Sequence, residues 1–331
     1  MLIRLLTAFV LFSLNSTDSF AGDLFDMLKR MSDADQQQNY QGTFILRKSD
    51  KLSTLRVTHG VDEKGEWETL EALNGESRNV IRHNNRVVSI YPERELVTIR
   101  HVADKQTLHP RLPDNIDKLE LFYTMNRLED DRIANHSALV IDLQPKDRYR
   151  YGYRYWVDKA TGMLLRCDLV SEDNVVVEQM MFTSLDYLSE KPEHLFEMQR
   201  FDQYKQKLLD EAVIEMQDSA PVEWTIKQLP QGFMLTQRTM RHSKPVSLQS
   251  RDPSASKPDL LHMVYSDGLA SVSVFIENHQ GPGKHVTGAS TMGAVNAYGH
   301  AVGDSFVTVV GEVPVKTVQS MAQSTVRVTG K

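Results

Sequence analysis

The stretch from Arg148 to Phe182 constrains the fold most, because it carries the longest continuous β signal in the chain. Its first part, Arg148–Trp156, has a tyrosine at every second position, so that in a strand the four rings share one face. These tyrosines are Tyr149, Tyr151, Tyr153 and Tyr155. The arginines, Gly152 and Trp156 would take the opposite face.

Two turn signals divide the remainder of this stretch. Asp158 can bond its own backbone two residues on, and Gly162 can adopt a positive φ without steric cost, so Asp158–Gly162 predicts a turn. Met163–Val170 would run back as the partner strand, and a second turn at Ser171–Asn174 would lead into Val175–Phe182. We therefore predict three neighbouring antiparallel strands in the middle of a large curved sheet.

The chain length indicates more than one domain. At 331 residues the chain exceeds what one core usually supports. A composition of 40% hydrophobic and 25% charged residues is ordinary for a globular protein. We predict a leader at 1–21, a large domain at 22–190, a linker at 191–220 and a small domain at 221–331.

The N-terminus resembles a cleavable signal peptide. Arg4 precedes an apolar run from Leu5 to Leu14, and small residues precede the cleavage site at Ser19 and Ala21. A membrane anchor is the alternative, but a run of ten residues is too short to span about 30 Å of hydrocarbon. Export is therefore predicted.

Cys167 is the only cysteine, so an exported chain of this sequence has no internal disulfide and must be stabilised by packed cores. Its place inside the predicted strand Met163–Val170 favours a small buried apolar side chain over a nucleophile. No histidine lies near it in the sequence.

The first two thirds otherwise predict one helix and a series of strands. Apolar residues at helical spacing indicate a helix at Gly22–Gln37 that packs on the sheet. Turn signals follow at intervals of about eight to twelve residues, which is typical of a meander or barrel. The predicted strands are Tyr40–Arg47, Leu52–Gly60, Arg86–Pro92, Arg94–Arg100, Phe122–Leu128 and Ala138–Leu143, with turns at Asp62–Trp67, Leu73–Ser77 and His83–Arg86.

Three segments lack a strand pattern. Residues 102–118 predict a loop crossing the sheet, with a short helix from Asn115 to Phe122. Pro192–Met198 indicates a helical turn. The apolar residues from Leu208 to Met216 have the spacing of an amphipathic helix, and a linker with one apolar face is the alternative.

The last third predicts a small α+β domain of about five strands and one helix. Pro314 can start the helix, whose apolar face would lie on the sheet. The hairpin at Asp267-Gly268 joins two of the strands, and a loop at His279–His285 precedes the others. The predicted strands are Val222–Gln228, Met234–Arg241, Leu260–Ser266, Leu269–Asn278, Thr291–Gly299 and Ser305–Val310.

Charge is divided unevenly between the two parts. From Pro221 onward there are 10 Lys and Arg against 7 Asp and Glu, a net of +3, which leaves −9 for the remainder of a chain whose total is −6. The two domains could attract each other, or the small one could meet an anionic partner, although solvated surface alone explains such values. Basic residues alternate with aromatic ones in Arg148–Trp156, but export and the negative net charge argue against nucleic acid as a partner.

No motif of catalysis or cofactor binding is recognised. The segment Gly288–Gly293, GASTMG, resembles a nucleophile elbow only loosely, because its glycines are one residue too far apart. Five of the 11 histidines lie in the last third, but their spacing matches no metal-binding pair. We therefore predict no cofactor and no metal.

Five stretches of the chain together carry a resemblance to a known family: Asn39–Arg47, Asp130–Leu169, Trp224–Phe233, Tyr265–Glu277 and Gly303–Ser324. They resemble the periplasmic MucB/RseB regulators of envelope stress in Gram-negative bacteria. The resemblance runs in order along nearly the whole chain and is weakest at Gln199–Asp218.

The resemblance implies a mainly antiparallel α+β fold. The large domain would be an unclosed β-barrel with helices, similar to the lipoprotein carriers LolA and LolB, and the small domain would be α+β. It also implies a periplasmic, non-enzymatic regulator that binds an RseA/MucA-like single-pass inner-membrane anti-sigma factor and hinders its cleavage. Lipid or lipopolysaccharide would relieve the inhibition. A homo-oligomer is compatible with this, and a periplasmic lipid or lipoprotein carrier is the competing function.

For the partner contact we expect residues of the small domain's Leu229–Phe233 and Tyr265–Leu269 turns and of the adjoining strand. These are Trp224, Phe233, Tyr265 and Leu269. The alternative is that the four are turn and core residues that shape the domain.

Overall fold

The computed structural model describes residues 18–101, 118–192, 201–209, 214–215, 223–241, 260–278 and 285–328. The leader as far as residue 17 lies outside these ranges, as do the crossing loop at 102–117 and most of the helical turn expected at Pro192–Met198. Most of the loop expected at His279–His285 also lies outside them.

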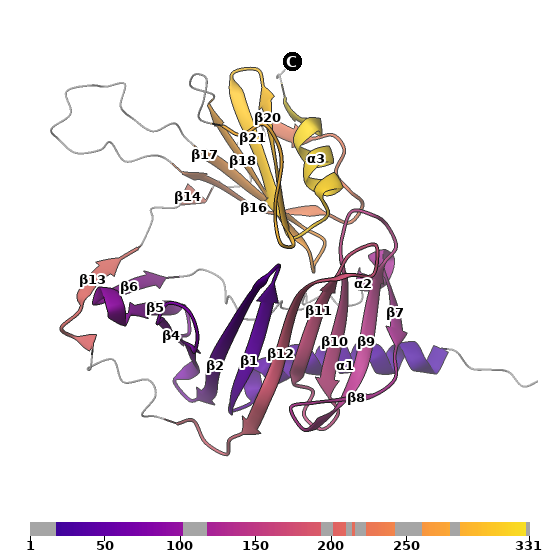
Figure 1. Cartoon of the computed structure of the whole chain (residues 1–331). Helices are drawn as coiled ribbons and strands as arrows, with labels where there is room; N and C mark the ends of the chain where they lie inside the picture. The colour runs from indigo at the N-terminus through magenta and orange to yellow at the C-terminus, as the bar shows by residue number, and fades with distance from the viewer. Residues whose placement is uncertain are drawn as a thin grey trace, which may run out of the picture.

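A large antiparallel sheet forms the first two thirds of the chain (Figure 1). Its 13 strands follow the order β13-β6-β5-β4-β3-β2-β1-β12-β11-β10-β9-β7, with β8 also paired to β9. The end strands β13 and β7 do not pair with each other among the described residues, so this path does not close. The predicted class, mainly antiparallel β with an unclosed sheet and few helices, is confirmed.

The strands of this sheet match the predicted meander closely. The first six are β1 Tyr40–Lys48, β2 Lys51–Asp62, β3 Gly65–Ala72, β4 Asn79–His83, β5 Arg86–Tyr91 and β6 Leu96–His101. The others are β7 Tyr123–Arg127, β8 Asp131–Ile133, β9 His136–Pro145, β10 Gly152–Asp158, β11 Leu164–Val170, β12 Val176–Tyr187 and β13 Lys205–Leu208. A 3-10 turn, Pro92–Arg94, separates β5 from β6, and the short helix α2, Leu119–Phe122, precedes β7.

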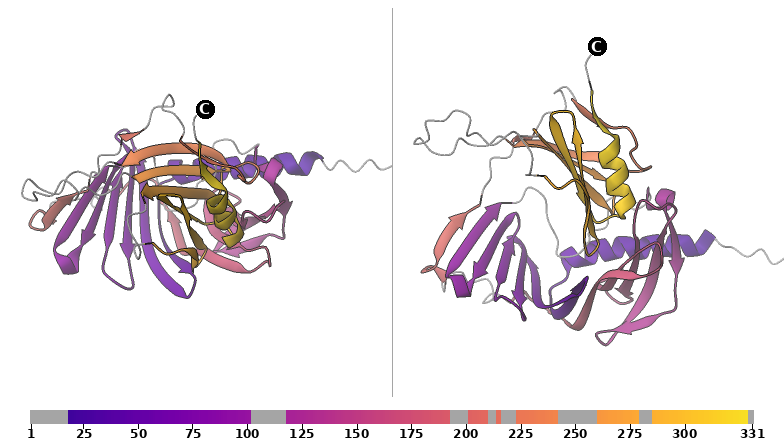
Figure 2. Two further views of the ribbon diagram at one scale, coloured as in Figure 1. Left: turned by 90° about the horizontal axis from the view of Figure 1, so that it is seen from above. Right: turned by 45° about the horizontal axis from the view of Figure 1, so that its top comes forward.

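The long helix α1, Asp18–Gln37, runs across the strands (Figures 1 and 2). Leu24, Leu28 and Met31 are buried on it, as the helical spacing predicted, and belong to one apolar core with the sheet. The helix begins four residues before the expected mature start at Gly22. Burying this apolar face is what holds α1 in place, because a single helix is only marginally stable in water.

The three central strands are those that the sequence predicted, and they pair antiparallel in the order β10-β11-β12. The backbone amide of Ala160 donates to Asp158 Oδ1 at 2.8 Å, and Gly162 has φ +83°. The turn therefore forms by the two features that indicated it. Tyr153 and Tyr155 are buried and stack with ring centroids 5.9 Å apart, and Cys167 is buried as expected.

A second, smaller core lies on strands β5 and β6 of the large sheet. Val88, Ile90 and Val97 pack there with Phe201, which comes from the section predicted as the linker. The linker section thus contributes an apolar side chain to the large domain.

The prediction of an amphipathic helix between Leu208 and Met216 is wrong for the residues of this section that the structure describes. Leu208 ends strand β13, which pairs in parallel with β6, and Ile214–Glu215 forms β14, which pairs with β16 of the small domain. The open edges of two sheets provide backbone partners that local helical spacing does not reveal. Hydrogen bonding across long sequence distances decides the conformation of this section.

The small domain has a seven-stranded antiparallel sheet, in the order β14-β16-β17-β18-β21-β20-β19, and a two-stranded pair, β15-β22. Helix α3, Val315–Ser324, begins after Pro314, as predicted, and buries Val318, Met321 and Ala322 against the sheet. The strands are β15 Trp224–Ile226, β16 Met234–Arg241, β17 Leu260–Ser266, β18 Ser271–Asn278, β19 Gly288–Met292, β20 Val295–Val302, β21 Ser305–Gly311 and β22 Thr325–Arg327.

The segment expected to form one strand at Thr291–Gly299 is instead a hairpin of β19 and β20. Gly293 has φ +66°, which lets the chain reverse there. This hairpin adds an edge strand that the sequence prediction of about five strands did not include. In the described part of the chain, no helix has the length and apolar character needed to span a bilayer.

Candidate functional site

The site lies where the small domain meets the large one, at the connection between β9 and β10. Arg148–Tyr151 does not continue strand β10, contrary to the prediction that Arg148–Trp156 forms one strand. Asp147 explains the difference: its Oδ1 accepts a hydrogen bond from the Tyr149 backbone amide at 2.9 Å, which is a local turn that competes with the sheet. The chain therefore bends, and Arg150 points toward the small domain.

Arg150 makes a buried ion pair with the hairpin of the small domain. The side chains of Arg150 and Asp267 are both fully buried, and Nη1 donates to Asp267 Oδ2 at 2.5 Å. Nη2 also donates to the Gln231 carbonyl at 2.5 Å, and Nε and Nη2 donate to Asp147. Two carboxylates and one carbonyl thus hold a single guanidinium, which is the arrangement that makes a buried charge tolerable.

Aromatic rings enclose this ion pair from both domains. The Arg150 guanidinium carbon lies 5.0 Å from the ring centroid of Phe122 and 5.1 Å from that of Phe233, within cation–π range. A Cβ on Gly232 would come within 2.5 Å of the Phe122 ring. A side chain at that position would therefore require the Phe122 ring to move.

The hydroxyl of Tyr123 completes the arrangement by donating to Asp267 Oδ2 at 3.2 Å. Burial raises the pKa of Tyr123 well above its ordinary value, and the negative charge of Asp267 raises it further. The pKa of Arg150 is also raised: burial alone would lower it, but the hydrogen bonds to Asp147 and the charge of Asp267 outweigh that effect. Both groups keep their protons across the physiological range.

A second polar contact lies beside the first. Asn296 Nδ2, buried in the small domain, donates to the Tyr151 hydroxyl at 3.0 Å and to the Val313 carbonyl at 2.8 Å. Thr317 Oγ1, in the first turn of α3, donates to the Tyr149 carbonyl at 2.7 Å. The connection at 146–151 thus makes hydrogen bonds with four separate parts of the small domain, through Gln231, Asp267, Asn296 and Thr317.

A third contact joins the other side of the junction. Lys48 Nζ lies 2.9 Å from Glu178 Oε2 of the large domain and 3.6 Å from Glu312 Oε1 of the small domain. Burial lowers the pKa of Lys48, but the hydrogen bonds and charges of Glu178 and Glu312 together outweigh it, so the pKa is raised. Because Lys48 and Glu312 are both nearly half exposed, this contact contributes little to stability compared with the buried pair.

The four residues expected to contact a partner are all partly or fully covered. Trp224 and Tyr265 belong to the core of the small domain. Phe233 is buried in that core and faces Arg150, and Leu269 packs against the core of the large domain. Phe233 and Leu269 therefore each lie at the domain junction, whereas Trp224 and Tyr265 are core residues of the small domain.

Sequence reasoning did not identify Arg150, Asp267 or Tyr123 as a unit. Asp267 was recognised only as a turn residue and Arg150 only as part of an alternating strand. They are 117 positions apart, and nothing local indicates their pairing. The available signal was Asp147, whose position before Tyr149 favours a turn at the point where the strand was expected.

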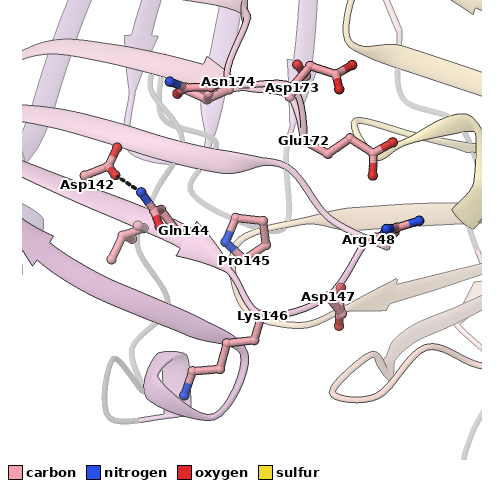
Figure 3. A pocket seen from close by; sticks show the side chains of 12 residues that line it. Asp142, Gln144, Pro145, Lys146, Asp147, Arg148, Glu172, Asp173 and Asn174 are labelled. Atoms are coloured by element: carbon pink, nitrogen blue, oxygen red, sulfur yellow. Dashed lines mark hydrogen bonds between the residues drawn. The ribbon is translucent and has the colours of Figure 1, made fainter.

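A polar hollow of about 800 Å³ lies next to the junction, between the β9–β10 connection and the β11–β12 turn. Figure 3 shows its side chains, with Gln144 donating to Asp142. Lysine and arginine contribute to the lining as well as Glu172 and Asp173, so the hollow has no single charge preference. No group of His, Cys, Asp and Glu residues that could hold a metal is found in the described ranges.

Fold and junction together define the class: a two-domain, mostly antiparallel β protein whose domains are joined through a buried ion pair. Profiles of the MucB/RseB N-terminal domain and of the MucB/RseB C-terminal domain match residues 23–206 and 218–326. The chain belongs to the MucB/RseB family.

Individual relatives support this membership over both domains. The Sigma factor AlgU regulatory protein MucB of Pseudomonas aeruginosa is 31% identical, over 92% of this chain and 91% of that protein. The Sigma-E factor regulatory protein RseB of Haemophilus influenzae is 25% identical, over 89% of each chain. A solved complex of Pseudomonas aeruginosa MucA and MucB contains a chain that is 28% identical, with a TM-score of 0.69 over 93% of this chain and 100% of that one.

Proposed function

We propose that this chain is a periplasmic regulator that binds the periplasmic segment of a MucA-like anti-sigma factor and protects it from regulated proteolysis. The observation that carries the proposal is the likeness of both domains, over 93% of the chain, to a protein solved in complex with MucA. The leader that the sequence predicts at 1–21 supports export, and the absence of recognised catalytic motifs in the sequence agrees with a binding role.

The buried junction gives this proposal a physical basis. A partner that touches both domains needs them in one fixed arrangement, since disorder between them would have to be removed on binding. Arg150, Asp267 and Tyr123 supply that order at the point where the domains meet.

We propose further that lipid or lipopolysaccharide in the large domain relieves the inhibition by shifting the domains relative to each other. Burial of an acyl chain releases about 0.8 kcal/mol per CH₂, so twelve methylenes supply roughly 10 kcal/mol. Disrupting a buried ion pair costs about 3–5 kcal/mol. A lipid that prefers the separated arrangement therefore has enough free energy to open the junction, provided that its affinity differs between the two states.

The test is a binding measurement on the exported form of the chain with a purified periplasmic segment of an anti-sigma factor. The segment should bind, resist a site-1 protease while bound, and be released by lipopolysaccharide. Failure to bind would refute the regulatory function. Binding that lipopolysaccharide leaves unchanged would refute only the sensing step.

A pull-down from envelope extract separates this function from that of a carrier. A regulator retains the anti-sigma factor, whereas a carrier retains lipoproteins or free lipid. Recovery of lipoproteins alone would favour the carrier.

A further inference from the structure

Strand β19, Gly288–Met292, forms an open edge of the small domain's sheet. It pairs antiparallel with β20 over all five residues without a register shift. Within the described residues no strand pairs with its other side. Such an edge presents backbone amides and carbonyls that another strand can use.

The composition of β19 sets it apart from the other sheet edges. At the ends of the two large sheets, β13 carries Lys205 and Lys207, β7 carries Arg127 and β14 carries Glu215. Charged edge residues of this kind discourage pairing with a second chain. The sequence of β19, GASTM, has no charge and no proline, so this protection is missing.

The side chains of β19 are small and exposed. Ala289, Ser290 and Thr291 lie in solvent, and Met292 is 78% exposed. Small residues on an edge leave room for larger side chains on an incoming strand, and such cross-strand pairs stabilise sheets. The segment was noted in the sequence only as a loose likeness to a nucleophile elbow, a role that the proposed function does not use.

One end of β19 lies at the domain junction. A Cβ added to Gly293, the next residue, would lie 3.4 Å from Glu178 Oε1 and 3.7 Å from Ser49, both in the large domain. Glu178 in turn holds Lys48, which reaches Glu312 of the small domain. One end of a strand added to β19 would therefore lie close to the turn between β1 and β2.

We propose that the outer edge of β19 takes up an extended segment of the partner polypeptide as an additional strand. The inference rests on the proposed function and names the surface where the anti-sigma factor would bind. A single extended segment fits better than a second copy of this chain, because a standard interface uses roughly 20–30 residues a side and this edge offers five. Backbone hydrogen bonds supply affinity in this mode, and side chains supply specificity.

The position also explains how the partner could sense the domain arrangement. A segment lying along β19 and the β1–β2 turn contacts both domains at once. Any movement of the small domain relative to Glu178 would displace one half of the bound segment from the other.

The experiment uses the exported chain and the purified periplasmic segment of Pseudomonas aeruginosa MucA. Ala289→Lys and Ser290→Lys place charges on the open edge, as β13 does naturally. Ala301→Lys is the matched control, because Ala301 is exposed in the neighbouring strand β20 and lies outside the five positions of β20 that pair with β19. We expect the edge variants to weaken Kd at least tenfold and the control to leave it unchanged.

Hydrogen–deuterium exchange provides a readout that does not depend on variants. Amides of β19 that face outward should exchange at least tenfold more slowly when the segment is bound. The inference would be overturned if the wild-type chain binds the segment but the exchange of the β19 amides does not change. It would also be overturned if the edge variants bind the segment as tightly as the wild-type chain. Either result would leave the proposed function intact.

Two other outcomes also count against it. If the wild-type chain does not bind the segment, the proposed function fails and this inference fails with it. If light scattering shows a dimer that the edge variants dissociate, the edge pairs with a second copy of the chain and not with the partner.

Discussion

Removal of the Asp267 carboxylate would test whether the buried ion pair holds the two domains together. In Asp267→Ala the Arg150 guanidinium loses its fully buried partner, and Tyr123 loses its acceptor. Removing one member of a buried pair costs about 3–5 kcal/mol. Because Asp147 and the Gln231 carbonyl still accept from Arg150, the lower end of that range, about 3 kcal/mol, is expected.

A loss of about 3 kcal/mol corresponds to a change of roughly 150-fold in the equilibrium between joined and separated domains. Urea unfolding should therefore show a lower first midpoint, and small-angle X-ray scattering should show a larger radius of gyration. Asp304→Ala is the control, since Asp304 is an exposed aspartate of the same domain and surface substitutions usually stay within about 0.5 kcal/mol.

A double-mutant cycle distinguishes the ion pair from a general packing defect. Arg150→Met combined with Asp267→Leu replaces the pair with apolar side chains, which is often neutral when the volume is similar. The double variant should regain the part of the loss that comes from an unpaired buried charge. It should not regain the part that comes from the Leu269 and Ala270 backbone amides, which lose Asp267 Oδ1 as their acceptor. If Asp267→Ala costs less than about 1 kcal/mol, or if the two single effects simply add, the buried pair does not control the junction.

Three further predictions concern the large domain. In urea unfolding, Gly162→Ala should destabilise this domain by at least about 1 kcal/mol more than Gly75→Ala. Both glycines have positive φ, but only at Gly162 would the new Cβ lie 3.2 Å from the α1 backbone. Equal losses of stability in the two variants would contradict this packing. The hydrogen bond from Lys191 is the main reason that the pKa of Asp62 is lowered to about 2. This contact therefore stabilises the fold above pH 4, and its contribution is lost as the pH falls from about 4 to 2. A titration of the Asp62 carboxyl carbon should show a midpoint at about 2, and Lys191→Met should raise that midpoint toward 3.8. Burial raises the pKa of the Cys167 thiol, so a thiol reagent at pH 8 should react with it only in urea, and rapid labelling of the folded chain would contradict its burial.

Local sequence signals were sufficient for most of the large sheet. Alternating strands separated by turn residues predicted β1 to β6, and the turn at Asp158–Gly162 formed by the bonds expected of it. These features depend on residues close together in the chain. The same holds for α1 and α3, whose apolar faces were visible at helical spacing.

The junction could not be predicted because its parts are distant in sequence. Arg150 has the same local pattern as its strand neighbours, and only its contact with Asp267 distinguishes it. The linker illustrates the same limit, since Leu208 has helical spacing but lies in β13, where β6 offers it a partner. The four residues expected to contact the partner remain a prediction: Trp224 and Tyr265 are buried in the core of the small domain, whereas Phe233 and Leu269 lie at the junction between the domains.

The attachment of the linker at both ends limits how far the domains can move. β13 is bonded to the large sheet and β14 to the small one, and only five residues separate Leu208 from Ile214. Fully extended, that stretch spans about 22 Å at most. The linker thus limits the distance between the two sheets. A signal that separates the domains further must first break the pairing of β13 or of β14 with its sheet. The loss of that strand would therefore be detected before the domains separate.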